Sequence, residues 1–476
     1  MTLSSRDGAF GFSGTLLAYD GEFYRVETEF GRLTVDGESV LCEGPACPSL
    51  ITPKAIIRIV GASEAGTKIL PPVLAAFAQS RGLVLQPASG SEPLRLVDPI
   101  AKKTLAEIGF QPMEPDAALT ALAEVRADLV IGSVAKPEFG SQTIALDALV
   151  PIVSQDNPLA QITTPQLAKA LAGEVKNWSE VGGPDMPLVL HGLRADSDLQ
   201  RALSARLGRE IAATVLHPDP ASLAAAVAHD PWALAITGQS SVGEARNLPL
   251  ADSCGFALSP SAFSVKAQDY PLTLPVYVLT PRRRLPLIAR EFLEFLASPN
   301  AQAAIETSGY SARAPMVQTI APEGVRLINA IQRAGVETTL VDLQRMVEVM
   351  ARAHRLSLTF RFLDGTNELD PASQDNLADL ARLIEADMFL GQTLVLAGFS
   401  DGTGEAANNQ NLSKTRADQV LQALQSALPE VGAPLLPQVE AFGEAMPIAC
   451  DETAAGRQLN RRVEVWVSPQ VLLQTP

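Results

Sequence analysis

The chain has 476 residues, of which 47% are hydrophobic and 19% are charged, so it contains enough apolar residues for several buried cores. Its formal net charge of −16 argues against binding to nucleic acid and to anionic membrane surfaces. The sequence contains no run of about 20 apolar residues, so we expect no membrane-spanning helix.

Residues 1–50 predict a small all-β unit. Short segments with apolar residues, at 10–21, 23–26 and 33–37, are separated by Gly-containing turns that are typical of short strands. This unit carries no catalytic constellation, so we expect it to serve in packing or in partner binding. The opening residues do not form a signal peptide, and we expect that a leader was removed and that Met1 was added for expression.

Strands and helices alternate over residues 56–316, which predicts an α/β fold with a largely parallel sheet. Residues 56–60 form an apolar strand, followed by a small-residue loop at 61–67 and a helix at 69–78 with two prolines in its first turn. Residues 129–133 predict another buried strand that ends in a turn of small residues. A strand, a small-residue loop and a helix N-terminus together form a seat for an anion, because free backbone N–H groups point into the loop.

The sequence of this region resembles those of the PstS-like periplasmic phosphate-binding proteins of ABC transporters. The resemblance is carried by ALDALVPIVSQDNPLAQITTPQLAKALAGEVKNWSEVGG, DPWALAITGQSSV, YPLTLPVYVLT and FLEFLASPNAQAAIETSGY. It implies a two-lobed type 2 periplasmic-binding-protein fold over residues 52–318, in which the lobes close over a ligand by hinge motion. It also implies an ABC transporter permease as a partner.

The same resemblance implies that phosphate or a similar oxyanion is bound by hydroxyl groups, backbone N–H groups and one arginine. The corresponding positions in this sequence are Ser63, Ser89, Ser91, Ser133, Arg194 and Ser197. Two departures matter: Asp198 stands where the family has a Gly-Thr anion seat, and Val134 replaces the acid that accepts a phosphate proton. A further carboxylate near a dianion is repulsive by about 1 to 4 kcal/mol. An oxyanion, another small ligand and a lobe pair used for protein contact therefore all stay open.

Residues 319–354 predict a helical linker, with helices at 325–332 and 341–353. The second helix has an apolar stripe, which we expect to pack on one of the large domains; a coiled-coil partner would need more heptads. The stripe consists of Leu340, Leu343, Met346, Val347 and Met350.

Residues 355–470 predict a β/α sandwich. Strands are expected at 356–362, 394–397 and 463–467, where apolar residues alternate with others or form a short run. Apolar stripes predict helices at 377–384 and 417–424, the first introduced by an N-cap aspartate and a first-turn proline at 370–371.

Two segments of this region carry a dense motif, AGFSDGTGEAANNQNLSKTRADQ and AAGRQLNRRVEVWV. They resemble the C-terminal OmpA-like peptidoglycan-binding domain, whose pattern is G-H-T-D, then Asn, then L-S-x-x-R-A and G-R-x-x-N-R-R-V. So many fixed positions at the right spacing make the resemblance specific. The matching residues are Gly398, Asp401, Asn409, Leu412, Ser413, Arg416, Ala417, Gly456, Arg457, Asn460, Arg461, Arg462 and Val463.

The resemblance implies a clamp for the zwitterionic end of diaminopimelate in the peptide stem of peptidoglycan. Asp401 would accept from the ammonium group, and Arg416 would bind the carboxylate with two parallel hydrogen bonds. The remaining pocket residues would be Thr403, Asn409 and Arg461, with Arg457 and Asn460 in the same cationic run. The sequence departs from the pattern at Phe399 and Ser400, where the family has His and Thr, so the position of this loop is in question. Peptidoglycan as ligand places the protein in a Gram-negative periplasm, associated with the cell wall.

The four cysteines predict disulfides. Cys42 and Cys47 flank a Gly-Pro turn and could close a small loop, whereas Cys254 and Cys450 lie in different domains and would, if bonded, lock one to the other. Zinc is the alternative, but the paired CxxC spacing is missing and the histidines are scattered.

No enzyme is predicted, because the sequence has no G-x-S-x-G elbow, no H-E-x-x-H and no P-loop, and no cofactor or metal site is expected. Two hypotheses remain. The first is a wall-anchored binding protein that captures phosphate or a similar oxyanion for ABC-type uptake. The second is a structural or sensory cell-envelope protein whose two-lobed domain binds another ligand or a protein partner.

Overall fold

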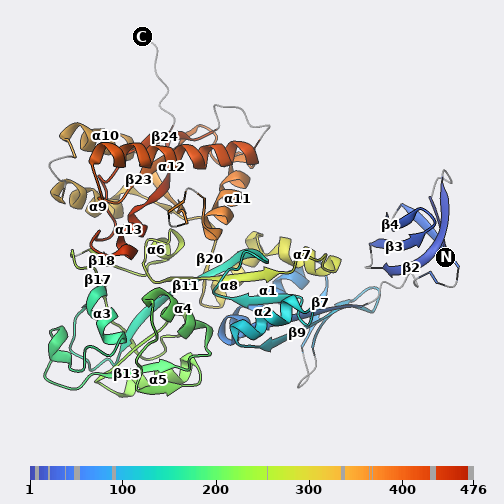
Figure 1. Ribbon diagram of the computed structural model, residues 1–476, viewed down its shortest axis with the longest axis horizontal. Coiled ribbons are helices and arrows are strands. Elements are labelled where there is room, and N and C mark those ends of the chain that lie inside the picture. The colour runs from blue at the N-terminus through green and yellow to red at the C-terminus, as the bar shows by residue number, and fades with distance from the viewer. Residues whose placement is uncertain are drawn as a thin grey trace, which may run out of the picture. The chain divides into compact units, whose positions relative to one another are not determined.

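The structure is a computed structural model that describes residues 1–5, 10–19, 22–37, 39–44, 46–47, 54–87, 93–254, 256–333, 338–363, 365–366, 368–428 and 436–469 (Figure 1). The chain forms two compact units. Unit 1 consists of Met1–Ile131, Pro137–Gly140 and Leu279–Ser308, and unit 2 consists of Gly132–Lys136, Ser141–Val278 and Gly309–Pro476. In the described part of the chain, no helix combines the length and the apolar character needed to cross a membrane.

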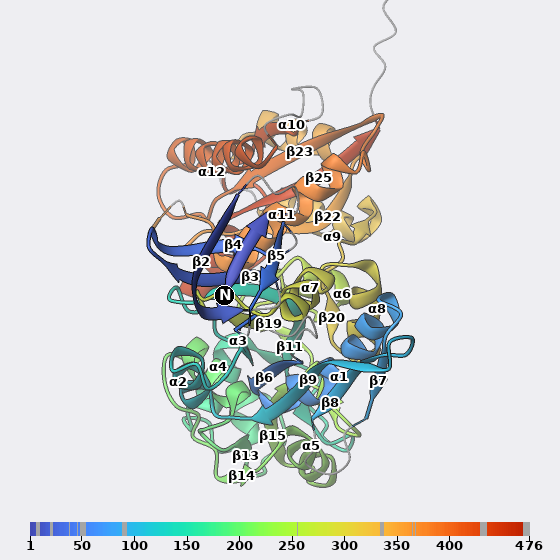
Figure 2. The same ribbon diagram turned by 90° about the vertical axis from the view of Figure 1, so that its right-hand side faces the viewer.

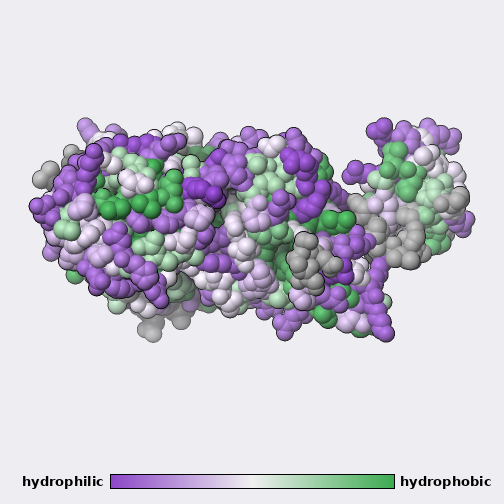
Figure 3. Space-filling model, turned by 90° about the horizontal axis from the view of Figure 1, so that it is seen from below, coloured by the Kyte–Doolittle hydropathy of each residue, from purple (hydrophilic) through white to green (hydrophobic). Residues whose placement is uncertain are grey.

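The N-terminal part of unit 1 is a five-stranded antiparallel sheet of order β4-β3-β2-β1-β5. Its small core contains Leu3, Tyr24, Val26 and Val40. Hydrophobic side chains also reach the surface of this sheet, at the right of Figure 3. The side chain of Phe30, for example, is 74% exposed. The strands are β1 (Thr2–Ser5), β2 (Gly11–Tyr19), β3 (Phe23–Thr28), β4 (Gly31–Asp36) and β5 (Val40–Glu43).

The α/β part of unit 1 has strand order β10-β6-β9-β8-β7, in which β10, β6 and β9 are parallel. Helices α1 and α8 pack together beside this sheet. The elements are β6 (Ala55–Gly61), α1 (Ser63–Ser80), β7 (Val84–Gln86), β8 (Leu94–Asp98), β9 (Lys103–Pro112), α2 (Pro115–Ala123), β10 (Leu129–Gly132), α7 (Leu287–Phe295) and α8 (Pro299–Thr307).

Helix α1 begins earlier than the sequence predicts. Most of the expected loop at 61–67 is the first turn of the helix, and Pro71 and Pro72 lie in its interior instead of its first turn. The helix continues through them because a continuous stripe, including Val73, Leu74 and Phe77, is buried on one face. Pro71 is exposed on the other side, where carbonyl groups that lose their hydrogen bonds can face solvent.

The α/β part of unit 2 has strand order β14-β13-β15-β11, with β14, β13 and β15 parallel and β11 antiparallel to β15. Its core is the largest apolar cluster that we describe and includes the fully buried Trp178. Helix α3 is capped by Thr163 through a reciprocal bond with Gln166. The elements are β11 (Gly140–Val153), β12 (Ile162–Thr163), α3 (Thr164–Leu171), β13 (Val189–Leu193), α4 (Asp198–Leu207), β14 (Val215–His217), α5 (Pro220–His229), β15 (Ala233–Gly238), β16 (Arg246–Asn247), β17 (Leu250–Ala251), β18 (Ala257–Leu258), α6 (Ala262–Lys266), β19 (Thr273–Thr280) and β20 (Ser311–Ala312).

The C-terminal part of unit 2 is a five-stranded mixed sheet of order β21-β22-β25-β23-β24. Figure 2 shows β22, β25 and β23 side by side, with α12 next to them. The elements are β21 (Val317–Gln318), α9 (Ile320–Arg333), α10 (Leu340–Met350), β22 (His354–Phe360), α11 (Pro371–Glu385), β23 (Gln392–Phe399), α12 (Ala406–Ala427), β24 (Gln438–Ala441), α13 (Ala454–Asn460) and β25 (Arg462–Pro469).

Each face of this sheet has its own apolar core. Helices α11 and α12 pack on one face, and α9 and α10 pack on the other together with the segment 442–446. The linker stripe therefore packs on the C-terminal sheet, with Leu343, Met346 and Met350 buried. Leu340, which the sequence places in the same stripe, is 69% exposed, because it is the first residue of α10, directly after the N-cap Thr339.

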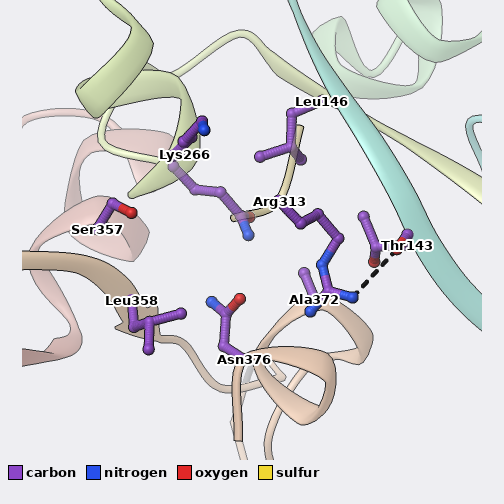
Figure 4. A pocket seen from close by; sticks show the side chains of 9 residues that line it. Thr143, Leu146, Lys266, Arg313, Ser357, Leu358, Ala372 and Asn376 are labelled. Atoms are coloured by element: carbon purple, nitrogen blue, oxygen red, sulfur yellow. Dashed lines mark hydrogen bonds between the residues drawn. The ribbon is translucent and has the colours of Figure 1, made fainter. Parts of the chain in front are cut away.

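Disulfides Cys42–Cys47 and Cys254–Cys450 are both formed. The second joins the two parts of unit 2, and the two bonds occupy all four of the sulfur atoms that the zinc alternative would use. Arg313 strengthens the same junction by donating to the Thr143 carbonyl at 3.2 Å and by pairing with Asp379. Figure 4 shows the polar pocket beside Arg313, a space of about 10 Å³ that is no larger than one water molecule requires.

A buried ion network lies between the C-terminal sheet and the adjoining α/β part of unit 2. Glu464, on β25, is fully buried and accepts from Arg326 at 2.7 Å and from Arg462 at 2.6 Å. Arg355 lies 3.3 Å from the same carboxylate and donates to Asp269 at 2.6 Å. Burial alone would raise the pKa of Glu464, but the three guanidinium groups hold it well below its usual range.

We predict that Glu464→Ala lowers the free energy of unfolding by about 3 to 5 kcal/mol, because it leaves buried arginines without their counter-charge. Urea unfolding of the full-length protein measures this loss. Glu27→Ala is the matched control, since Glu27 pairs with Arg32, whose side chain is 79% exposed. Equal unfolding midpoints for the two variants would contradict the prediction.

Candidate functional site

The predicted clamp residues lie at one end of the C-terminal sheet, where β23 leads into the loop that carries Asp401 and α12 carries Arg416. Strand and helix meet closely at Gly398, because a Cβ there would lie 2.2 Å from the carbonyl oxygen of Ser413. Ser413 is itself buried and its hydroxyl accepts from the N–H of Gly443 at 3.1 Å. This close approach brings the first turns of α12 beside the Asp401 loop.

Asp401 is held in place by its own loop and by one arginine. Its Oδ1 accepts from the Thr403 N–H at 3.0 Å, and its Oδ2 accepts from Arg461 Nη1 at 3.0 Å. Partial burial would raise the pKa of Asp401, but the hydrogen bonds from Arg461 and Thr403 lower it below its ordinary value. The carboxylate is therefore ionised and fixed at neutral pH.

Arg416 is half-buried, and within the described ranges no hydrogen bond compensates its charge. Its Nε and Nη1 are buried without a hydrogen-bond partner in the described part of the chain. Its guanidinium carbon lies 5.7 Å from the ring centroid of Phe362. The pKa of Arg416 is lowered by burial and by the positive charge of Arg461, and the charge of Asp401 opposes this. Two cations and one anion thus lie close together, with N–H groups left to bind an acceptor.

Three other predicted residues of the site form hydrogen bonds with the loops around it. Asn409 is buried and donates to Glu444 at 2.7 Å. Asn460 is also fully buried; its Oδ1 accepts from the N–H groups of Ile448 and Ala449, and its Nδ2 donates to Asp451. Arg457, Asn409 and Asn460 therefore hold loops around the site, since Arg457 donates to the backbone carbonyl of Asp451 at 2.7 Å.

Phe399 and Ser400, where the sequence departs from the pattern, point to different surroundings. Phe399 is fully buried on the α9–α10 side of the sheet, where its ring lies 5.8 Å from that of Phe442 and 4.2 Å from the guanidinium carbon of Arg462. Its hydrophobic packing secures the end of β23. The hydroxyl of Ser400 is buried, next to Asp401 in the chain, and has no hydrogen-bond partner among the described residues.

Sequence reasoning missed Asp451, which joins three parts of this site. It accepts from the Gly402 N–H at 2.9 Å and from Asn460 Nδ2 at 2.8 Å. An acidic residue three positions before the start of α13 was the available signal, but it lies 49 residues from Gly402 in the sequence.

The predicted oxyanion residues are divided between the units. Ser63 is the exposed first residue of α1 in unit 1, and Ser89 and Ser91 lie outside the described residues. In unit 2, Ser133 follows β10, and Ser197 is the N-cap of α4 but makes no side-chain capping bond. Arg194 is exposed and lies 3.8 Å from Asp196.

Asp198, the acid that replaces the Gly-Thr seat, binds the backbone of Ser133. The Ser133 N–H donates to Asp198 Oδ1 at 3.3 Å, and burial raises the pKa of this carboxyl group. A carboxylate of the protein thus uses a donor that the sequence assigns to the oxyanion.

Family comparisons match both parts of the chain. Residues 361–461 match the model of the OmpA family, and residues 114–300 match that of a PBP superfamily domain. The outer-membrane lipoprotein YfiB of Pseudomonas aeruginosa is 32% identical over 124 residues, which are 25% of this chain and 70% of YfiB. The chain belongs to the OmpA family. Its OmpA domain contains the Asp401–Arg416 site, and neither matched family is enzymatic.

Other relatives are similar to one part of the chain only. Outer membrane porin F of Pseudomonas fluorescens is 33% identical over 121 residues, and the chain spans 36% of its length. These residues are 25% of this chain. The phosphate-binding protein PstS of Bacillus subtilis is 27% identical over 171 residues, which are 35% of this chain and 55% of PstS.

We predict that Arg461→Ala raises the pKa of Asp401 toward its ordinary value, because it removes the guanidinium group that donates to Oδ2. NMR titration of the carboxyl carbons in aspartate-labelled protein measures this shift. Arg457→Ala is the control, because Arg457 donates to the Asp451 carbonyl instead. An unchanged titration of Asp401 in Arg461→Ala would contradict the assigned cause.

Proposed function

We propose that the OmpA domain binds peptidoglycan by gripping the zwitterionic end of diaminopimelate in the peptide stem. The observation that carries the proposal is Arg416, whose Nε and Nη1 are buried and have no hydrogen-bond partner among the described residues, and whose pKa is affected by the charge of Asp401. A ligand carboxylate would supply an acceptor for the Arg416 guanidinium group and would balance its positive charge. The ligand ammonium would then donate to Asp401, whose pKa is already lowered.

The surrounding charges support a zwitterion over a simple anion. Arg461 and Arg416 provide two positive charges, and Asp401 provides one negative charge that Arg461 already contacts. The carboxylate of a zwitterionic ligand can pair with Arg416 while its ammonium group donates to Asp401. A simple anion would pair with Arg416 only, and the remaining acceptor sites of the Asp401 carboxylate would bind water. In the cell, this function places the protein in the periplasm, associated with the wall.

We predict that Asp401→Ala and Arg416→Ala each weaken binding to purified sacculi by at least about 30-fold, because losing one partner of a desolvated charge pair costs at least about 2 kcal/mol. Co-sedimentation of the full-length protein measures the change. Lys414→Ala on the same helix is the matched control, because Lys414 is 62% exposed and pairs with Asp418. Full binding by both clamp variants would refute the clamp.

For the PBP domain we propose binding of phosphate or a similar small oxyanion, for delivery to an ABC transporter permease. Similarity to PstS supports this proposal, as does a helix N-terminus at α4 whose cap hydroxyl, Ser197, makes no capping bond. The bond between Asp198 and Ser133 instead favours the second candidate, a structural or sensory protein whose PBP domain binds another ligand or a protein partner.

Calorimetric titration of the full-length protein with inorganic phosphate separates these candidates. If the domain is an oxyanion receptor, we expect binding by the native protein and tighter binding by Asp198→Asn, which removes the repulsive charge. Asp196→Asn is the control, since Asp196 is exposed and lies on the same turn. Absence of phosphate binding in all three proteins would favour the second candidate.

A further inference from the structure

The loop at 450–452 of the OmpA domain is fixed to a turn of the PBP domain, where residues 252–254 contact Cys450 and Glu452. Cys450 forms a disulfide with Cys254, and its N–H donates to Asp252 Oδ2 at 2.7 Å. Ser253 donates to Glu452 at 2.9 Å. A disulfide and two hydrogen bonds to carboxylates therefore hold the same short loop.

On the PBP side, a buried carboxylate holds this attachment. Asp252 is 5% exposed, and its Oδ1 accepts from the N–H of Cys254 at 3.0 Å and from that of Phe256 at 2.8 Å. The carboxylate thus folds its own turn with one oxygen and binds the OmpA loop with the other. Movement of Cys450 would break contacts that are already buried.

On the OmpA side, the next residue contacts the ligand site. Asp451 Oδ2 accepts from the N–H of Gly402, the residue after Asp401, at 2.9 Å. Oδ1 accepts from the buried amide of Asn460. A Cβ at Gly402 would lie 2.8 Å from Asp451 Oδ2, so the loop that carries Asp401 rests directly on this carboxylate.

We propose that Asp451 is a positioning residue of the peptidoglycan site, and that the Cys254–Cys450 disulfide holds it in place from the PBP domain. The inference rests on the proposed function of the Asp401–Arg416 site. Cys450 and Asp451 are both outside the motif that defines this site, so the attachment is a property of this chain. Without the disulfide, the 450–452 loop gains freedom, the Gly402 N–H loses its fixed acceptor, and Asp401 is held less firmly against its ligand.

The test compares two disulfide deletions in the full-length protein. Each variant is titrated with a diaminopimelate-containing stem tripeptide, and thermal unfolding is recorded in parallel. We expect the double variant Cys254→Ser/Cys450→Ser to bind at least about tenfold more weakly, which corresponds to about 1.4 kcal/mol. The double variant Cys42→Ser/Cys47→Ser, which lacks the disulfide of the N-terminal sheet, should bind like the native protein.

Asp451→Asn tests the contact between Asp451 and the loop that carries Asp401, with the disulfide intact. The amide keeps the size of the side chain but replaces one acceptor oxygen by an NH₂ group, which cannot accept from Gly402 or from Asn460. We expect Asp451→Asn, like Cys254→Ser/Cys450→Ser, to bind the stem tripeptide more weakly than the native protein does. This variant also decides the matter if removal of the disulfide prevents folding.

Reversible reduction provides the same comparison without a substitution. A dithiol reductant transfers two electrons and two protons to Cys254–Cys450 and itself becomes a cyclic disulfide. Affinity for the tripeptide should fall on reduction and return on reoxidation, in the native protein and in Cys42→Ser/Cys47→Ser alike.

The outcomes separate this inference from the function on which it rests. If the native protein does not bind the tripeptide, the proposed function fails. If the native protein binds, and Cys254→Ser/Cys450→Ser and Asp451→Asn bind equally well, the positioning role is overturned, even when the melting temperature falls. Equal losses in both disulfide variants would also overturn it, because the effect would then not depend on the 450–452 loop.

Discussion

The C-terminal domain depends on a buried carboxylate, Glu464, in the middle of its sheet. A lone ionised carboxylate at this depth would be very unfavourable, but three guanidinium groups surround it. One of them, Arg355, also donates to Asp269 in the α/β part of unit 2, and Arg361 reaches Asp269 at 3.1 Å. The same network therefore stabilises the interior of the sheet and its junction with the neighbouring domain. Because each charge is stable only while its partners remain, the network favours one arrangement of these elements.

This network also adjoins the candidate site, through neighbouring residues at the start of β25. Arg462 is fully buried and donates to Glu464, with its guanidinium over the ring of Phe399. Arg461, one position earlier, faces Asp401. Asn460 closes α13 and holds the 448–451 segment. Three consecutive polar residues thus have three functions, because each successive side chain points to different surroundings.

Features that depend on local sequence were predictable. Asp370 and Pro371 indicated the start of α11, and the Asp370 side chain does accept from the Ser373 N–H at 2.7 Å. Alternation indicated β22 and β25 to within a few residues. The pattern also singled out Asp401 and Arg416, and in the structure the charge of Asp401 acts against the lowering of the Arg416 pKa.

Features that depend on long-range packing were not predictable in the same way. The start of α1 follows from its buried stripe, which outweighs the two prolines that suggest a later start. The role of Asp451 depends on Gly402, and that of Asp252 depends on Cys450, 198 residues away. No periodicity or local motif encodes such a contact. The pairing of the cysteines likewise stayed open until the structure placed Cys254 beside Cys450.

The two candidate binding sites differ in how the protein treats its own charges. At the OmpA site, Asp401 is paired with Arg461, while Arg416 keeps buried N–H groups that no described residue accepts from. Leaving such donors unsatisfied costs free energy, which a ligand carboxylate would recover on binding. In the PBP domain the Ser133 N–H already has a carboxylate acceptor in Asp198. An incoming anion must displace that carboxylate or bind beside it. An anion therefore gains less binding free energy at Ser133 than a carboxylate gains at Arg416. The difference explains why the structure supports a ligand for the OmpA domain more directly than a particular solute for the PBP domain.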